Sequence, residues 1–252
     1  KYVTKLPTLK VSGGKRVGRP HFDKKDYNTL TRYMSRWVEE PIKGKDQPNG
    51  YDRMRHRQRF YLQHYILVMS NTGCRVGEMR GVSWSRLSPS VDNEGTPSVV
   101  ISVQGKTGKR QVVAQPVVVE YLQRILDFRS AELGMSKQDF QSQRLNEPIF
   151  CSPDGKPIGH YKKSFARLIK EAGVAYAPDG QKRVIYSLRH TYAVFRLIAK
   201  TPLFQLASNM GADERMIMDF YGHHQTDDPD YVSSLTQSNQ QSKGTPLSFL
   251  DG

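Results

Sequence analysis

The sequence predicts an α+β fold that is predominantly α-helical and contains one small antiparallel β-sheet. In several segments the apolar residues are spaced three and four apart, which places them on one face of a helix. Residues 99–103 and 112–114 instead alternate apolar and less apolar side chains around residues 105–109, a pattern that indicates a β-hairpin with a basic tip. The chain has 252 residues, 37% of them hydrophobic, which is enough to bury one large core or two small ones.

Helices are expected on both sides of this hairpin. The first is predicted to be capped by Asp23 and to carry Leu30 and Trp37 on its apolar face. Pro116 is placed to begin the helix after the hairpin, and Gly134 to end it. In chain order the expected elements are helices near residues 23–40, 53–71, 75–84, 116–134, 161–172, 186–199, 202–211 and 213–222, with a short strand at 148–151 and no predicted element at 136–147.

Four arginines crowd the start of the second predicted helix: Arg53, Arg55, Arg57 and Arg59. Side chains two residues apart spread around a helix, so some of them must face solvent. We interpret this cluster as a solvated or phosphate-facing surface rather than a site that reads bases.

The charge of the chain gives the first indication of function. Its 38 Lys and Arg against 24 Asp and Glu give a net charge of +14 and a pI near 9.8, which indicates a polyanionic partner. A membrane surface is the competing partner, but no basic amphipathic helix with a clean apolar face stands out, so nucleic acid is favoured. No apolar run approaches the roughly 20 residues that a membrane span requires.

The N-terminus and the cysteines bear on the compartment. No signal peptide is recognisable, and a chain that starts at Lys1 is expected to be a fragment or a processed product. Cys74 and Cys151 lack the spacing of metal ligands. They are expected to be reduced, structural thiols in a cytoplasm.

Four short motifs carry residues suited to chemistry on a phosphate. In Thr-Gly-Cys-Arg-Val-Gly-Glu, Arg75 precedes Glu78 by three residues, so both lie on one helical face. Arg189 lies in Tyr-Ser-Leu-Arg-His-Thr, Lys106 lies at the hairpin tip, and Tyr221 lies near the end of a C-terminal helix. Arginine suits phosphate because its planar fork grips two oxygens and stays charged at any working pH.

Taken in this order, the motifs resemble those of the tyrosine recombinases, also called the phage integrase family, from about Asp23 to His223. The resemblance implies the fold of the family's catalytic domain, and it implies that the chain cuts and rejoins DNA strands without metal, ATP or another cofactor. The residues that it implies are catalytic are Arg75, Lys106, Tyr186, Arg189 and Tyr221, with supporting roles for Glu78 and His190.

Each implied role has a chemical reason. Tyr221 would attack the scissile phosphate and form a 3′-phosphotyrosyl bond. Arg75 and Arg189 would stabilise the charge that builds on the phosphate oxygens, and Glu78 would orient Arg75. Lys106 would act as the general acid that protonates the departing 5′ oxygen.

Two tyrosines compete for the role of nucleophile, because the C-terminal motif fits the sequence in two frames. If residues 210–212 (Met-Gly-Ala) take the family's Leu-Gly-His position, the nucleophile is Tyr221, 32 residues after Arg189. If residues 221–223 take it, the nucleophile is Tyr231, 42 residues after Arg189 and in an Asp-rich segment that would repel phosphate. The first frame also keeps a helix directly before the motif, so Tyr221 is favoured.

Two positions depart from the family pattern. Tyr186 stands where the family usually has histidine, and Ala212 stands where it has histidine or tryptophan. A phenol can donate a hydrogen bond to phosphate, but with an ordinary pKa of about 10 it is a poorer general base than imidazole. Similar motifs occur among integrase-like members, so inactivity is not inferred. The candidates to accept the proton of the nucleophile are His190, His223 and His224.

Other polar residues are expected to bind DNA or to have no role in chemistry. The expected DNA contacts are Lys109, Arg110 and Arg80. The His and Asp residues within 223–228 have no ligand spacing known for zinc, so no metal site is expected.

The predicted organisation has three parts: a basic linker or arm at residues 1–20, the catalytic domain at 21–224 and a C-terminal tail at 225–252. The resemblance further implies a missing N-terminal core-binding domain, a monomer without DNA, a homotetramer on paired attachment sites with the tail packing in trans, and a cytoplasmic, bacterial or phage-encoded protein. Two alternatives stay open: a type IB topoisomerase and a non-catalytic or regulatory DNA-binding module.

Overall fold

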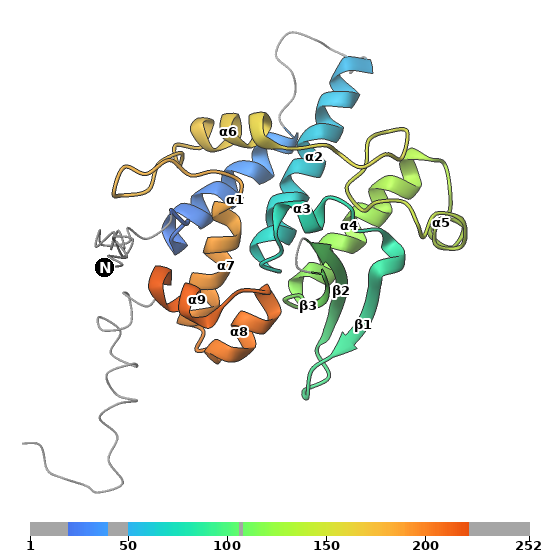
Figure 1. The fold of residues 1–252 in the computed structure, drawn as a ribbon. Helices are drawn as coiled ribbons and strands as arrows, with labels where there is room; N and C mark the ends of the chain where they lie inside the picture. The colour runs from blue at the N-terminus through green and yellow to red at the C-terminus, as the bar shows by residue number, and fades with distance from the viewer. Residues whose placement is uncertain (1–19, 40–49, 106–107, 222–252) are drawn as a thin grey trace, which may run out of the picture.

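The computed structural model describes residues 20–39, 50–105 and 108–221 (Figure 1), without the side chains of residues 50, 51 and 219–221. The described residues form a mostly helical α+β fold with a three-stranded antiparallel sheet, which confirms the predicted class. Its elements are α1 (Lys24–Glu39), α2 (Gly50–Ser70), α3 (Val76–Met79), the 3-10 helix η1 (Trp84–Arg86), β1 (Leu87–Val91), β2 (Pro97–Gly105), β3 (Gly108–Val113), α4 (Val117–Glu132), α5 (Lys137–Gln143), α6 (Lys162–Glu171), α7 (Ser187–Ile198), α8 (Leu203–Met210) and α9 (Glu214–Tyr221).

The sheet has the strand order β1-β2-β3, and both neighbouring pairs are antiparallel. Val99, Ile101 and Val103 of β2 are buried while the residues between them are more exposed, because successive residues of a strand face opposite sides. Ile101 pairs with Leu87 of β1 and with Val112 of β3. The hairpin of β2 and β3 is therefore the predicted one, and β2 contacts α4, which lies beside the sheet (Figure 1).

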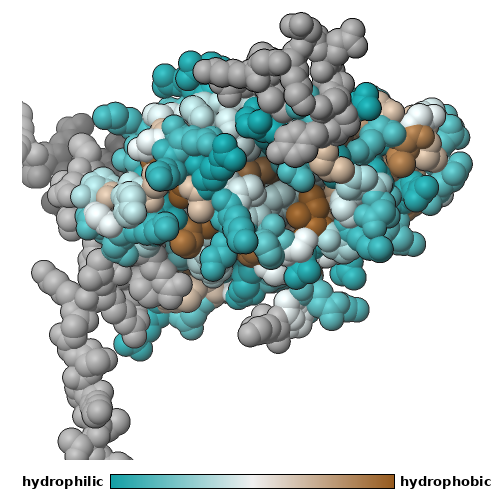
Figure 2. Space-filling model, turned by 90° about the horizontal axis from the view of Figure 1, so that it is seen from above, coloured by the Kyte–Doolittle hydropathy of each residue, from teal (hydrophilic) through white to brown (hydrophobic). Residues whose placement is uncertain are grey.

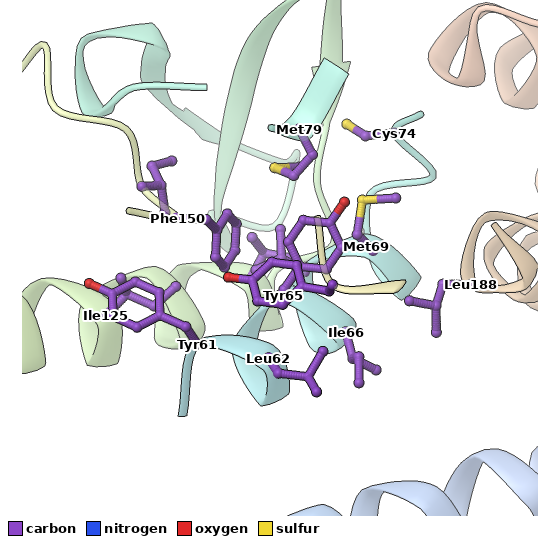
Figure 3. Close-up of a cluster of buried hydrophobic side chains, with 14 of the residues drawn as sticks. Tyr61, Leu62, Tyr65, Ile66, Met69, Cys74, Met79, Ile125, Phe150 and Leu188 are labelled. Atoms are coloured by element: carbon purple, nitrogen blue, oxygen red, sulfur yellow. The ribbon is translucent and has the colours of Figure 1, made fainter. Parts of the chain in front are cut away.

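Helix α2 runs through the main core and contacts α1, α4 and α7. Tyr61, Tyr65 and Ile66 of α2 are buried, and Figure 3 shows them grouped with Phe150 and, from the start of α7, Leu188. Because α2 contacts all three of these helices, their buried side chains belong to one main core.

A second, smaller hydrophobic cluster joins α7, α8 and α9, which lie together in Figure 1. Its buried members are Tyr192, Ala193, Val194, Leu206, Ala207, Met210 and Ile217. The two C-terminal helices thus pack on α7 through this cluster, and α8 also contacts β3.

Local sequence signals place most helix ends as predicted. Before α1, Asp23 Oδ1 accepts a hydrogen bond from Asp26 N at 2.7 Å, and before α9, Asp213 Oδ1 accepts one from Arg215 N at 2.7 Å. Gly211 ends α8 with a φ of 60°, a left-handed conformation that glycine adopts at little cost.

The prediction that the arginines of α2 face solvent or phosphate is wrong for two of the four. Arg57 is buried and pairs with Glu132 of α4 at 2.6 Å. Arg59 is buried with its guanidinium 4.6 Å from the ring centroid of Trp37, and it donates to the Trp37 carbonyl. Their partners come from distant parts of the chain, whereas Arg53 is exposed as predicted.

Three smaller features differ from the prediction. Strand β1 and helix α5 were not predicted, although Ser136 caps α5 by accepting from Asp139 N at 3.0 Å. The predicted strand at 148–151 is instead two isolated bridges, Ser83 with Pro148 and Cys151 with Pro157.

The surface agrees with a chain whose apolar residues are mostly inside. Hydrophilic side chains cover most of the face shown in Figure 2, with small hydrophobic patches between them. Within the described ranges no helix combines the length and the apolar character needed to cross a bilayer. Cys74 and Cys151 are free thiols and are buried, in agreement with structural roles.

Candidate active site

A tight turn between α2 and α3 brings two distant parts of the chain together. Gly73 has a φ of +65°, and a Cβ at this position would lie 2.3 Å from Tyr192 Cδ1 of α7, so no larger residue fits without movement. The carbonyl of Gly73 accepts a hydrogen bond from Arg189 Nη1 at 2.5 Å. The turn therefore fixes the N-terminal part of α7 against the residues that precede α3.

Arg75 directly follows this turn and caps α3. Its backbone N–H donates to Glu78 Oε2 at 2.8 Å, and its Nη1 donates to Glu78 Oε1 at 2.7 Å. Its Nη2 donates to the carbonyl of Gly211, at the end of α8. The Arg75 side chain is still 30% exposed, so it can reach a ligand while it is oriented by the predicted partner Glu78.

Arg110 is the third charged group of the cluster, and its position was not foreseen. Its Nη2 lies 2.6 Å from Glu78 Oε2, its Nε lies 3.3 Å from Glu78 Oε1, and its Nη1 donates to the carbonyl of Asn209. The side chain is only 14% exposed. It points inward from β3 rather than outward as a DNA contact would, which the alternation with buried Val112 two residues later could have indicated.

Glu78, whose carboxylate lies between Arg75 and Arg110, is 4% exposed. Burial by itself raises the pKa of Glu78, but the hydrogen bonds from Arg110 and Arg75 outweigh it and hold the pKa below its usual range. Glu78 therefore stays ionised and can orient both guanidinium groups.

Arg189 lies on the first turn of α7 and is 2% exposed. Its Nη1 is bonded to Gly73, but its Nη2 is buried and has no hydrogen-bond partner among the described residues. Burial lowers the pKa of Arg189, and the charges of Arg75 and Arg110 act in the same direction. Arginine nevertheless remains protonated at neutral pH, so a buried donor is left available next to two other cations.

Tyr186 and His190 flank Arg189 at the start of α7. Tyr186 is half-buried, and its ring meets the His190 ring edge to face, with centroids 5.0 Å apart. Tyr186 also acts electrostatically on Arg189. The structure therefore brings both predicted residues to the side of the arginine cluster on which α7 begins.

The end of α8 is docked onto the same cluster. The Asn209 side chain accepts from Val113 N at 2.8 Å and donates to Val113 O at 3.0 Å, so it pairs with the edge of β3. The same amide donates to Tyr192 Oη at 2.9 Å. Ala212 packs against the second hydrophobic cluster instead of offering a polar group.

The remaining predicted residues are described only in part. Lys109 and Arg80 are exposed, as DNA contacts would be. Tyr221 is the last residue of α9, but its side chain lies outside the described residues, as do Lys106, His223, His224 and Tyr231. Within the described ranges no group of His, Cys, Asp and Glu is arranged to hold a metal ion.

Comparisons with known proteins show what the fold resembles. No model of a protein family matches the sequence, and no curated protein sequence does either. Among solved structures, the XerH site-specific recombinase bound to a palindromic difH substrate matches 86% of this chain, with a TM-score of 0.58 and 16% identity. The XerA recombinase matches 86% of the chain with a TM-score of 0.53 and 19% identity, and a lambda integrase dimer bound to a COC′ core site matches 84% with a TM-score of 0.53 and 17% identity.

These similarities establish the fold of recombinases and integrases over most of the chain. The chain corresponds to 53% of the length of XerH, 64% of XerA and 51% of lambda integrase. Identities below 20% do not transfer an activity to this chain.

Proposed function

We propose that this chain is the catalytic part of a site-specific DNA recombinase that cuts and rejoins strands through a 3′-phosphotyrosyl intermediate, without metal or ATP. The observation that carries the proposal is the meeting of Arg75 and Arg189 around the Gly73 turn, with a buried Arg189 Nη2 that has no partner among the described residues. A single phosphodiester group would supply the acceptor oxygens that this arrangement lacks. The net charge of +14 and the likeness to DNA-bound recombinases support the same ligand.

In the proposed first step, the phenolic oxygen of Tyr221 attacks the scissile phosphorus and the bond from phosphorus to the 5′ oxygen breaks. Negative charge concentrates on the non-bridging oxygens as phosphorus becomes five-coordinate, and Arg75 and Arg189 stabilise it there. Lys106 supplies the proton that the leaving 5′ oxygen takes up. A 5′-hydroxyl of the partner strand then attacks the phosphotyrosine and gives its proton to Lys106. The bond from phosphorus to Tyr221 breaks, the phenol regains its proton from the group that accepted it, and the new strands are joined.

The proton of Tyr221 needs an acceptor when the bond to phosphorus forms. Of the described groups, His190 is proposed for this role, with Tyr186 as a hydrogen-bond donor to the phosphate, because the two rings adjoin each other beside Arg189. Lys109 and Arg80 are proposed to bind the DNA backbone from the exposed surface.

The assembly is also part of the proposal. The chain spans about half the length of XerH and of lambda integrase, so a separate core-binding domain would complete a clamp around the duplex. In this proposal the domain at residues 21–224 carries the chemistry, the arm at 1–20 follows the DNA, and the tail at 225–252 links four protomers on paired sites. This chain alone should bind DNA weakly.

Covalent trapping tests the proposal. The protein is incubated with a pool of duplexes that contain a randomised central segment. Each duplex is nicked, because loss of the short fragment next to the nick prevents religation. DNA linked to protein on a denaturing gel supports the chemistry. The adduct should be lost in Tyr221→Phe and kept in Tyr231→Phe, and the opposite result would assign Tyr231 as the nucleophile.

One alternative has an observation in its favour. The absence of a histidine at Tyr186 and at Ala212 also suits a DNA-binding module that does not cleave. Such a protein would shift the duplexes on a native gel but would form no covalent adduct. A type IB topoisomerase would instead relax supercoiled plasmids that carry no selected site.

A further inference from the structure

Arg110 occupies a position that the proposed reaction does not explain. It comes from the middle of β3, yet its guanidinium lies among the groups that hold Arg75. Both oxygens of Glu78 are shared between the two arginines. Oε1 accepts from Arg75 Nη1 at 2.7 Å and from Arg110 Nε at 3.3 Å, and Oε2 accepts from the Arg75 backbone at 2.8 Å and from Arg110 Nη2 at 2.6 Å.

We propose that Arg110 is a positioning residue that sets the orientation of the Arg75 guanidinium by fixing the Glu78 carboxylate and the end of α8. The inference rests on the proposed function in one respect, because the proposed function is what gives Arg75 a role in catalysis. The orientation itself is a property of the folded protein and can be measured without DNA.

The first link runs through Glu78. A fork-to-carboxylate contact through Nε and Nη2 holds the plane of the carboxylate, whereas a single hydrogen bond would let it rotate. Arg75 Nη1 donates to this carboxylate, so its direction depends on that plane. If Arg110 is removed, Arg75 alone must hold a buried carboxylate, and the pKa of Glu78 loses the strongest cause of its decrease.

The second link runs through the end of α8. Arg110 Nη1 donates to the Asn209 carbonyl, and two residues later the Gly211 carbonyl accepts from Arg75 Nη2. A Cβ at position 211 would lie 2.7 Å from Arg110 Nε, so glycine lets the α8 turn approach the arginine closely. Arg110 therefore supports both partners of the Arg75 guanidinium, one on each side.

Side-chain NMR tests the proposal on the whole chain. The Nε–Hε signals of Arg75 and Arg189 are assigned with the variants Arg75→Lys and Arg189→Lys. In Arg110→Gln the Arg75 signal should shift and its hydrogen exchange should accelerate about tenfold or more, while the Arg189 signal, anchored by Gly73, should shift less and keep its exchange rate. Arg110→Lys should give a smaller shift, and Arg124→Gln, which breaks an exposed pair on α4, should give none.

A pH titration of the Arg75 signal gives a measurement that a general loss of packing would not reproduce. The Arg75 signal should follow protonation of Glu78, and the midpoint in Arg110→Gln should lie above that of the wild type, because the hydrogen bond from Arg110 lowers the pKa of Glu78. If Arg110→Gln does not fold, Arg110→Lys, which keeps the charge but cannot form the two-point contact with Glu78, should move the Arg75 signal in the same direction by a smaller amount. A folded Arg110→Gln protein with unchanged Arg75 signal and midpoint would overturn the inference.

The trapping assay separates this inference from the proposed function. If the wild type forms the covalent adduct, Arg110→Gln should slow adduct formation about 10- to 100-fold with little change in DNA binding, and Arg110→Lys should recover part of the rate. An equal rate for Arg110→Gln would contradict the inference while the proposed function stands. If no wild-type adduct forms but the Arg75 signal responds as expected, the proposed function fails and the positioning role is supported.

Discussion

Gly73 and Gly134 are a matched pair for testing the turn that brings the two arginines together. Both have nearly the same left-handed φ, +65° and +64°, but a Cβ at Gly73 would lie 2.3 Å from Tyr192 Cδ1, whereas a Cβ at Gly134 meets nothing within 4 Å. Alanine in this conformation costs about 1–2 kcal/mol at either position. Forcing the Tyr192 ring aside should add about 1–3 kcal/mol at Gly73 alone.

Urea unfolding of the two single variants measures that difference. Gly73→Ala should lower the free energy of unfolding by about 2–5 kcal/mol in total, and Gly134→Ala by the smaller strain term alone. Adding Tyr192→Ala makes room for the new methyl group, so the extra penalty of Gly73→Ala should disappear in that background. Equal penalties for the two glycines, or an extra penalty that persists without the Tyr192 ring, would refute the reasoning.

Three further predictions concern polar side chains that hold parts of the fold: two are buried, and the third, Asn209, is half-buried. Burial lowers the pKa of His64 from 6.5 to about 4. The stability that this group contributes is therefore fully present above pH 6.5 and should be lost as pH falls toward 4, by about 3 kcal/mol in all. Urea unfolding should show this loss in the wild type, and an equally steep decrease in unfolding free energy with falling pH in His64→Phe would contradict it. Arg129→Met leaves buried Glu147 without its main partner, 2.7 Å away, and should cost about 3–5 kcal/mol in thermal or urea unfolding. Arg124→Met at an exposed pair is the control and should cost less than about 1 kcal/mol, so equal costs would argue against the buried pair. Asn209→Ala should raise the hydrogen-exchange rate of the Val113 amide about 10-fold or more while α2 keeps its protection, and unchanged Val113 exchange would show that the amide does not hold the edge of β3.

Local signals explain which parts of the fold were predictable. Caps such as Asp23 and the break at Gly211 act within one turn of helix, so they are readable from neighbouring residues. Strand β1 was missed because its sequence, Leu-Ser-Pro-Ser-Val, contains a proline and alternates little, and an edge strand tolerates both. Residues 148–151 were read as a strand because they are apolar, yet their bridges go to two separate loops.

The candidate site was predictable to the extent that its contacts are local. Arg75 and Glu78 are three residues apart on a helix, so their contact follows from spacing. Arg57 was misread because its partner Glu132 lies 75 residues away, and a charged residue looks solvated until such a partner is known. The role of Gly73 as the acceptor for Arg189 depends on a packing contact between α7 and a distant turn, which no sequence spacing encodes.

The balance of charge in the cluster argues for a ligand rather than for stability alone. Arg75, Arg110 and Arg189 carry three positive charges around the single carboxylate of Glu78, which leaves a net charge of +2 among these four groups. A buried cation without a full set of partners costs free energy, and Arg189 Nη2 is such a group among the described residues. Apolar side chains in place of these charged groups would fill the same space at a lower cost in folding free energy. The arrangement is therefore understandable if an anion supplies the missing negative charge. A phosphodiester brings one negative charge and two free oxygens, which matches the open donors of Arg189 and the exposed part of Arg75.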